Sequence, residues 1–254
     1  MTTKGILALA ATAAVLGGVA WYERSGVRMR GSRLNGERLV PRFEVADVAS
    51  VEIGDKVKLA AGADGWTVVT MQDYPADRAK ITEGLMKLWD LKVGQVVRGK
   101  ELAEKTPVTV RDASGRELAS VTLGERHAKW GFGRYAAFKD ETVLVGDPLD
   151  AFGDDPLRWC DTKIVDEPYI RFSALADPAI SAEELGFATG VVKAVTVAGD
   201  TNRTVTVGNA VKGGSDRYLR LDGSKWTFVV PGYSVEKLLP SASEGENGAE
   251  TRLD

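Results

Sequence analysis

The sequence predicts an α+β fold of repeated antiparallel β-meander units, each followed by a helix or helical turn, with an N-terminal transmembrane helix. First, a variant of residues 108–152 returns from residue 195 onward. This period of about 80 residues exceeds the roughly 20–50 residues of a solenoid repeat and favours two related lobes. Second, short alternating runs are not interleaved with long crossover helices, which favours α+β over α/β. When the two copies are aligned, Gly124 falls on Gly208 and Arg134 falls on Arg217.

Composition excludes several classes of protein. The 254 residues are 44% hydrophobic and 27% charged, as in an ordinary globular protein. The net charge of −3 argues against nucleic acid as the main partner, because phosphate binding requires a basic face. A single cysteine, Cys160, excludes an intramolecular disulfide. We interpret it as a small, partly buried residue beside Trp159 and not as a reactive thiol.

The N-terminal segment predicts a membrane anchor over residues 1–23. Residues 5–22 carry no charge, which meets the short end of the roughly 17–25 residues that span hydrocarbon. A cleaved signal peptide, with a small-x-small site at residues 18–20, is the alternative. No cysteine follows the run, so lipoprotein anchoring is excluded. The anchor residues would be Ile6, Leu7, Leu9, Val15, Leu16, Val19, Trp21 and Tyr22.

Two sequence patterns give opposite indications of the orientation of this segment in the membrane. The run is rich in alanine and opens on Lys4, as secretory segments do. We therefore expect a single-pass inner-membrane protein with its C-terminal domain on the periplasmic side. The positive-inside rule opposes this expectation, because four arginines follow the segment: Arg24, Arg28, Arg30 and Arg33.

The first lobe is expected over residues 39–165, after a linker at residues 24–38 that is rich in glycine, serine and arginine. Strands are predicted at residues 48–53, 57–59 and 66–69. Residues 74–77 open a helix whose apolar face is formed by Ile81, Leu85, Leu88 and Trp89.

Two hairpins complete the first lobe. One turns at residues 112–115, between strands at 108–110 and 118–123. The other turns at Lys139 and Asp140, between strands at 135–138 and 142–145.

The second lobe is expected over residues 166–240. A capping box at residues 181–184 starts one short helix before Gly186. The later hairpins turn at residues 199–200 and 222–223. Residues 241–254 form a small, acidic tail almost without apolar residues, which predicts disorder.

No catalytic, cofactor-binding or metal-binding constellation emerges, so we expect a protein that is not an enzyme. His127 is the single histidine and lacks the partners that a base or a zinc site requires; we interpret it as a surface loop residue. Gly124, Gly131 and Gly133 fit no phosphate-binding pattern. The acidic residues between 147 and 167 lack EF-hand spacing, which leaves only weak cation binding open. A hydrolase built on two carboxylates also stays open, because their separation depends on the fold.

One aromatic and basic patch, Trp130, Phe132 and Arg134, could form an interface. Aromatic residues and arginine are typical of contact hot spots. Arg134 recurs as Arg217 within a strand, which favours a structural role for it. Trp130 and Phe132 lack counterparts in the later copy and are the better candidates.

Several short motifs, in this order, carry a resemblance to a family. They are residues 39–53 (LVPRFEVADVASVEI), Gly65-Trp66, residues 74–77 (YPAD), residues 88–92 (LWDLK) and residues 159–163 (WCDTK). Over residues 39–239 the chain resembles the domain of unknown function 4340 family of bacterial envelope proteins. The resemblance implies a membrane-anchored, exported protein without assigned activity. Members are often associated with auxiliary components of gliding-motility-type ABC transport systems. No functional residues of the family carry over.

Two functional hypotheses of different classes follow. The first is a non-enzymatic, membrane-anchored envelope protein, an accessory or scaffold component of a transport or envelope-assembly complex. Its partners would be envelope or transporter proteins. The alternative is a module that binds a glycan, lipid or peptide through the loop of Trp130 and Phe132.

Overall fold

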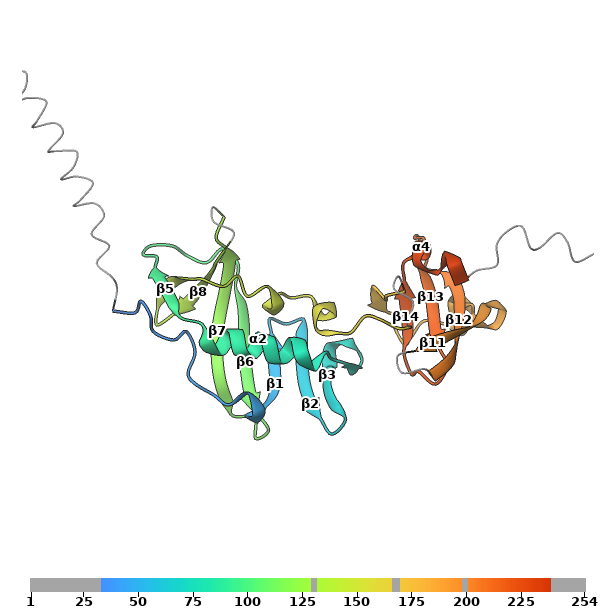
Figure 1. Ribbon diagram of the computed structural model, residues 1–254. Coiled ribbons are helices and arrows are strands. Elements are labelled where there is room, and N and C mark those ends of the chain that lie inside the picture. Colours follow the sequence, from blue (N-terminus) through green and yellow to red (C-terminus); the bar gives the residue numbers. More distant parts are fainter. Residues whose placement is uncertain (1–32, 129–131, 166–169, 198–200, 239–254) are drawn as a thin grey trace, which may run out of the picture. The chain divides into compact units, whose positions relative to one another are not determined.

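The computed structural model describes residues 33–128, 132–165, 170–197 and 201–238 (Figure 1). The expected anchor over residues 1–23, most of the linker, Trp130 and the acidic tail lie outside these ranges. Within them, no helix combines the length and the apolar character that a membrane crossing requires.

The molecule is mostly antiparallel β-sheet, which confirms the prediction in its coarse form, an α+β or β-rich fold. One sheet has nine strands in the order β4-β3-β2-β1-β6-β7-β8-β9-β5, and the other has five in the order β10-β14-β13-β12-β11. The strands of the first sheet are β1 (Val48–Ile53), β2 (Val57–Gly62), β3 (Gly65–Val68), β4 (Tyr74–Pro75), β5 (Val93–Val96), β6 (Thr106–Asp112), β7 (Glu117–Arg126), β8 (Arg134–Phe138) and β9 (Glu141–Val145). Those of the second are β10 (Ala174–Leu175), β11 (Val191–Val197), β12 (Thr201–Ala210), β13 (Arg217–Leu221) and β14 (Thr227–Val230).

Helices are few among the described residues. The α-helices are α2 (Arg78–Asp90), α3 (Ala182–Leu185) and α4 (Gly232–Val235). Short 3₁₀ turns lie at Val45–Asp47, Val69–Met71, Asp150–Phe152, Pro156–Trp159, Phe187–Thr189 and Glu236–Leu238. The N-cap of the predicted capping box is confirmed: the Ser181 hydroxyl accepts a hydrogen bond from the Glu184 amide at 3.1 Å, and Gly186 is the C-cap of α3.

The chain forms two compact units. Among the described residues, the first contains residues 33–42, Lys87–Thr106 and Val121–Leu149. The second contains Phe43–Met86, Pro107–Ser120 and the described residues from Asp150 to Leu238.

In the first unit, the β8–β9 hairpin forms where the sequence predicts it. Its turn residues Lys139 and Asp140 have φ of 47° and 63°, as a two-residue type I′ turn requires. Because successive side chains of a strand point to opposite faces, one face of this hairpin is buried. Its residues Ala136, Val143 and Val145 are all fully or nearly fully buried.

The start of the first unit corrects the predicted linker. The Gly36 amide donates to the Val93 carbonyl at 2.7 Å, and the Val93 amide donates to the Glu37 carbonyl at 2.8 Å. The Leu39 amide donates to the Leu91 carbonyl at 2.9 Å, and the Arg38 guanidinium lies 4.6 Å from the Trp89 ring. The last residues of the segment expected as linker therefore belong to the folded unit.

In the second unit, α2 starts later than the sequence predicts. Asp77 caps it, since its carboxylate accepts hydrogen bonds from the amides of Ala79 at 2.9 Å and Lys80 at 3.3 Å. The preceding Tyr74 and Pro75 were expected inside the helix start but form the edge strand β4, paired with β3. Proline is tolerated there because an edge strand has one side without ladder bonds.

The apolar face of α2 is buried as predicted. Ile81, Leu85 and Leu88 are each at most 2% exposed, while Trp89 is half-buried. Within the second unit, Gly84 lets two aromatic rings approach the helix. A Cβ on Gly84 would lie 3.2 Å from the Trp159 ring and 3.5 Å from the Phe152 ring. These two rings pack edge to face, 5.7 Å apart.

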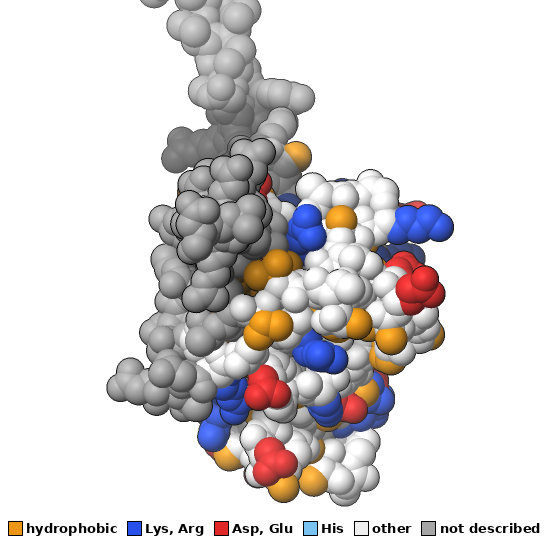
Figure 2. Space-filling model, turned by 90° about the vertical axis from the view of Figure 1, so that its right-hand side faces the viewer, with side chains coloured by type: hydrophobic (Ala, Val, Ile, Leu, Met, Phe, Trp, Pro, Cys, Tyr) orange, Lys and Arg blue, Asp and Glu red, His pale blue; other side chains and the backbone are white. Residues whose placement is uncertain are grey.

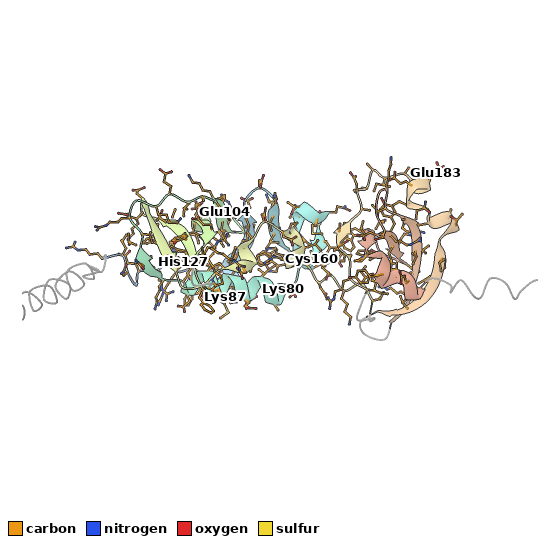
Figure 3. All side chains as sticks on the ribbon, turned by 90° about the horizontal axis from the view of Figure 1, so that it is seen from above. Lys80, Lys87, Glu104, His127, Cys160 and Glu183 are labelled. Carbon is orange, nitrogen blue, oxygen red and sulfur yellow. The ribbon has the colours of Figure 1, made fainter. Side chains whose placement is uncertain are left out.

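Cys160 is buried in the same region, next to Lys80 (Figure 3). The Lys80 ammonium donates to the Cys160 carbonyl at 2.8 Å, and the Cys160 sulfur lies 3.6 Å from the Met71 sulfur. Burial raises the pKa of the Cys160 thiol to about 11, although the Lys80 charge opposes the shift. A thiol with such a pKa stays protonated at neutral pH, as expected for a structural cysteine.

The two sheets share several features. Strands β6-β7-β8-β9-β5 of the first are adjacent in the same relative order as β11-β12-β13-β14-β10 of the second. The pairing register shifts between Leu123 and Arg126 in β7, and between Val207 and Ala210 in β12.

Candidate protein-binding loop

The loop between β7 and β8 presents the most exposed of the large apolar side chains in the described residues. Phe132 is 84% exposed, although it belongs to a residue type that is usually buried. The loop is closed at its base by a hydrogen bond of 3.0 Å from the His127 amide to the Gly133 carbonyl. Trp130, the other aromatic candidate, lies outside the described residues.

A β-bulge in β7 forms the support below this loop. The register shift between Leu123 and Arg126 places Gly124 where the chain near Leu102 passes over the strand. A Cβ on Gly124 would lie 2.5 Å from the Leu102 Cδ2 and 3.3 Å from the Tyr135 Cβ. A larger residue at this bulge would therefore force the Leu102 side chain to move, whereas glycine accommodates it in place.

Arg134 fixes the bulge from inside the first unit. Its side chain is 8% exposed, and its Nε donates to the Gly124 carbonyl at 2.6 Å. Its Nη1 donates to the Leu149 carbonyl at 3.3 Å. Arg134 is therefore not an exposed contact residue, which corrects its place in the predicted interface. The structural role that its recurrence as Arg217 suggests fits this position: the Arg217 Nη1 donates to the Gly208 carbonyl at 3.2 Å.

Glu125 connects the bulge to the segment that crosses it. Its carboxylate accepts hydrogen bonds from the Lys100 ammonium at 2.6 Å, the Ala103 amide at 3.0 Å and the Glu104 amide at 3.5 Å. Lys100 also lies 4.4 Å above the Tyr135 ring, a cation–π arrangement. Burial alone would raise the pKa of Glu125, but these hydrogen bonds outweigh it and lower the pKa to about 2.

Replacing Glu125 with glutamine should destabilise the first unit by about 1.5–3 kcal/mol at pH 7, the typical contribution of hydrogen bonds to a charged group. The folded-state pKa of about 2 lies below the ordinary value of 4.5. The ionised carboxylate therefore stabilises the fold above that ordinary value, and this stabilisation is lost as the pH falls toward 2. Thermal unfolding of both proteins from pH 7 to pH 2 measures the effect. The difference in Tm should shrink below pH 4.5; a difference independent of pH would contradict this account.

His127 lies at the base of the loop and is half-buried, less exposed than the surface position we expected. Its ring lies 5.6 Å from the Tyr135 ring. Across the described residues, no three histidine, cysteine or acidic side chains gather closely enough to hold a metal ion.

Three of the acidic residues in the described part of the segment 147–167 bind the local backbone. The carboxylates of Asp147, Asp155 and Asp161 each accept a hydrogen bond from the amide two residues later, at 2.7, 3.0 and 3.0 Å. Asp154 forms an ion pair with Lys56 at 2.6 Å. Such turns explain why aspartate is frequent in this segment without any ligand.

Sequence reasoning identified the exposed aromatic residue of the loop but missed its supports. The positions of Glu125 and Lys100 in the sequence give no sign that they meet. The signal that could have indicated the bulge is the recurrence of Gly124 and Arg134 as Gly208 and Arg217. Neither a protein-family model, nor a curated protein, nor a solved structure matches this chain.

Proposed function

We propose that this protein is a non-enzymatic, membrane-anchored envelope protein that contributes a binding module to a transport or envelope-assembly complex. The observation that carries the proposal is the 84% exposure of Phe132 on a loop whose base is fixed by Arg134. An exposed aromatic side chain on a preorganised support is typical of a contact hot spot, because little ordering is needed on binding.

The segment before the described residues supports the membrane part of the proposal. Its uncharged run over residues 5–22 is long enough to span hydrocarbon and ends in Trp21 and Tyr22. The alanine-rich run after Lys4 supports export, with the folded units on the periplasmic side. The family resemblance of residues 39–239 points the same way.

The charge distribution supports a protein partner. Basic and acidic side chains are interspersed over the face of the molecule in Figure 2. Together with the net charge of −3, this surface is unsuited to a nucleic acid, whose binding requires neutralisation of several phosphates.

The architecture of the proposed module is an internal duplication of a five-stranded unit. Strands β5 to β9 and β10 to β14 share their relative order, and β7 and β12 share a bulge. The bond from Arg134 to Gly124 in one copy has its counterpart in the bond from Arg217 to Gly208. In this proposal the first copy alone acquired the exposed aromatic loop, since Phe132 has no counterpart in the second.

Replacing Phe132 with alanine should reduce partner recovery by more than about tenfold, because truncation of a hot spot typically costs 2 kcal/mol or more. The full chain carries an affinity tag and is isolated from cells in mild detergent, and the proteins that co-purify are quantified. Tyr233→Ala is the matched control, since Tyr233 is also exposed (75%) but lies on α4, outside this loop. Recovery of the same partners at the same level with Phe132→Ala would overturn the assignment of the loop.

The same loop could instead bind a glycan, lipid or peptide, as Phe132 is equally suited to an apolar or sugar face. A photo-crosslinking residue at position 132 of the full chain separates the two proposals. A cross-linked envelope protein supports the first, and a cross-linked lipid, glycan or short peptide supports the second.

A further inference from the structure

Among the described residues, the five-stranded sheet ends in an edge with no further strand beside it. Strand β11 is the last strand of that sheet, and its only neighbour among the described strands is β12. The two strands pair over all seven residues of β11, from Val191 to Val197, without a register shift. The outer backbone groups of β11 are thus an available template for another strand.

The comparable position in the nine-stranded sheet is filled. There the strand before the bulged strand is β6, and β1 pairs with it in antiparallel orientation. Val51 lies opposite Val110 and Ile53 opposite Val108. The occupant that the fold accepts beside such a strand is therefore an extended, antiparallel segment with apolar residues.

The sequence of β11 carries little of the usual protection of an edge. Its sequence, VVKAVTV, contains no proline and a single charge, Lys193. Natural edge strands are commonly kept from pairing by proline, charges, bulges or short length. Val192 is 61% exposed, so apolar surface accompanies the open edge.

We propose that β11 pairs in antiparallel orientation with β11 of a second copy of this chain, which joins the two five-stranded sheets into one continuous sheet. The sequence of the strand is complementary to its own reverse. With the twofold axis at Ala194, this residue lies opposite Ala194 of the second copy. Val191 then lies opposite the valine at position 197 of the second copy, and Val192 lies opposite the threonine at position 196.

Charge disfavours one alternative register of this pairing. Lys193 would lie opposite a valine, the residue at position 195 in the second copy. An axis at Lys193 would instead place two lysines opposite each other, which is unfavourable. The register centred on Ala194 pairs all seven residues without a like-charge contact, and a symmetric pair of this kind closes after two copies.

Disulfide trapping tests the register directly. Ala194→Cys in the full chain should form a disulfide-linked dimer under mild oxidation, because directly opposed residues have Cα atoms about 4.5–5.5 Å apart. Val192→Cys is the matched control: it would lie roughly four residues, or about 13 Å, from its own copy and should stay monomeric. The unmodified chain, whose buried Cys160 is its one thiol, should also give no linked dimer.

A charge exchange separates this edge from contacts made elsewhere. Ala194→Lys and Ala194→Glu, each alone, should weaken the dimer by about two- to fivefold, while an equal mixture should restore it as a heterodimer. Sedimentation of the full chain in detergent measures the association, and circular dichroism shows whether each variant is folded. A monomer at all concentrations, linkage through position 192 in place of 194, or a mixture no tighter than the single variants would each overturn the proposal.

Discussion

Replacing Phe152 with alanine is expected to lower the free energy of unfolding of the second unit by about 3–5 kcal/mol. The Phe152 side chain is fully buried (0% exposed) and packs edge to face on Trp159. Its removal leaves a cavity against the backbone of α2 at Gly84, which a helix cannot easily fill by moving. Denaturant unfolding of the full chain, followed by tryptophan fluorescence, measures the loss.

Phe132→Ala provides the matched control for this prediction. The chemical change is identical, but Phe132 is exposed, so its effect on stability should stay within about 0.5 kcal/mol. Equal losses for the two variants would show that the packing around Phe152 does not determine the stability of the second unit.

Replacing Arg134 with alanine is expected to destabilise the first unit by about 3 kcal/mol, because two buried hydrogen-bond acceptors lose their donor. The carbonyls of Gly124 and Leu149 would each lose a donor inside the protein, and each buried acceptor left unpaired costs about 1–3 kcal/mol. The same denaturant experiment detects the loss. Because the bulge supports the loop, the recovery of any partner through Phe132 should fall as well.

Arg217→Ala is the corresponding change in the other sheet. Arg217 is half-buried and donates to the Gly208 carbonyl at the longer distance of 3.2 Å. Its loss should therefore cost only about 0.5–1.5 kcal/mol, the usual net value of one hydrogen bond. A larger effect for Arg217 than for Arg134 would contradict the structural account of the bulge.

The features that sequence reasoning predicted well are those with local signals. The turn at Lys139 and Asp140 and the apolar face of α2 depend on residues close together in the chain. The hairpin between β6 and β7 was equally visible, because Asp112 accepts hydrogen bonds from Ser114 and Arg116 within its own turn.

The features that sequence reasoning missed depend on residues that are far apart in the chain. Tyr74 and Pro75 have a composition compatible with a helix start, yet pairing with β3 places them in a strand. Arg134 was suggested as a contact residue because arginine is common at interfaces. Its burial is decided by carbonyls at Gly124 and Leu149, ten and fifteen positions away. Phe132 was the simpler case, since its lack of a counterpart in the later copy had marked it as an interface candidate.

The attachment of residues 36–39 to the end of α2 and the start of β5 has a mechanical meaning. Any tension applied to the chain upstream of Arg33 meets the backbone bonds from Gly36 to Val93 and from Leu39 to Leu91 before it reaches the central strands. The cation–π contact of Arg38 with the Trp89 ring strengthens the attachment at the same place. If the chain is anchored at its N-terminus, these backbone hydrogen bonds are the first in the described residues to carry a pull from the anchor.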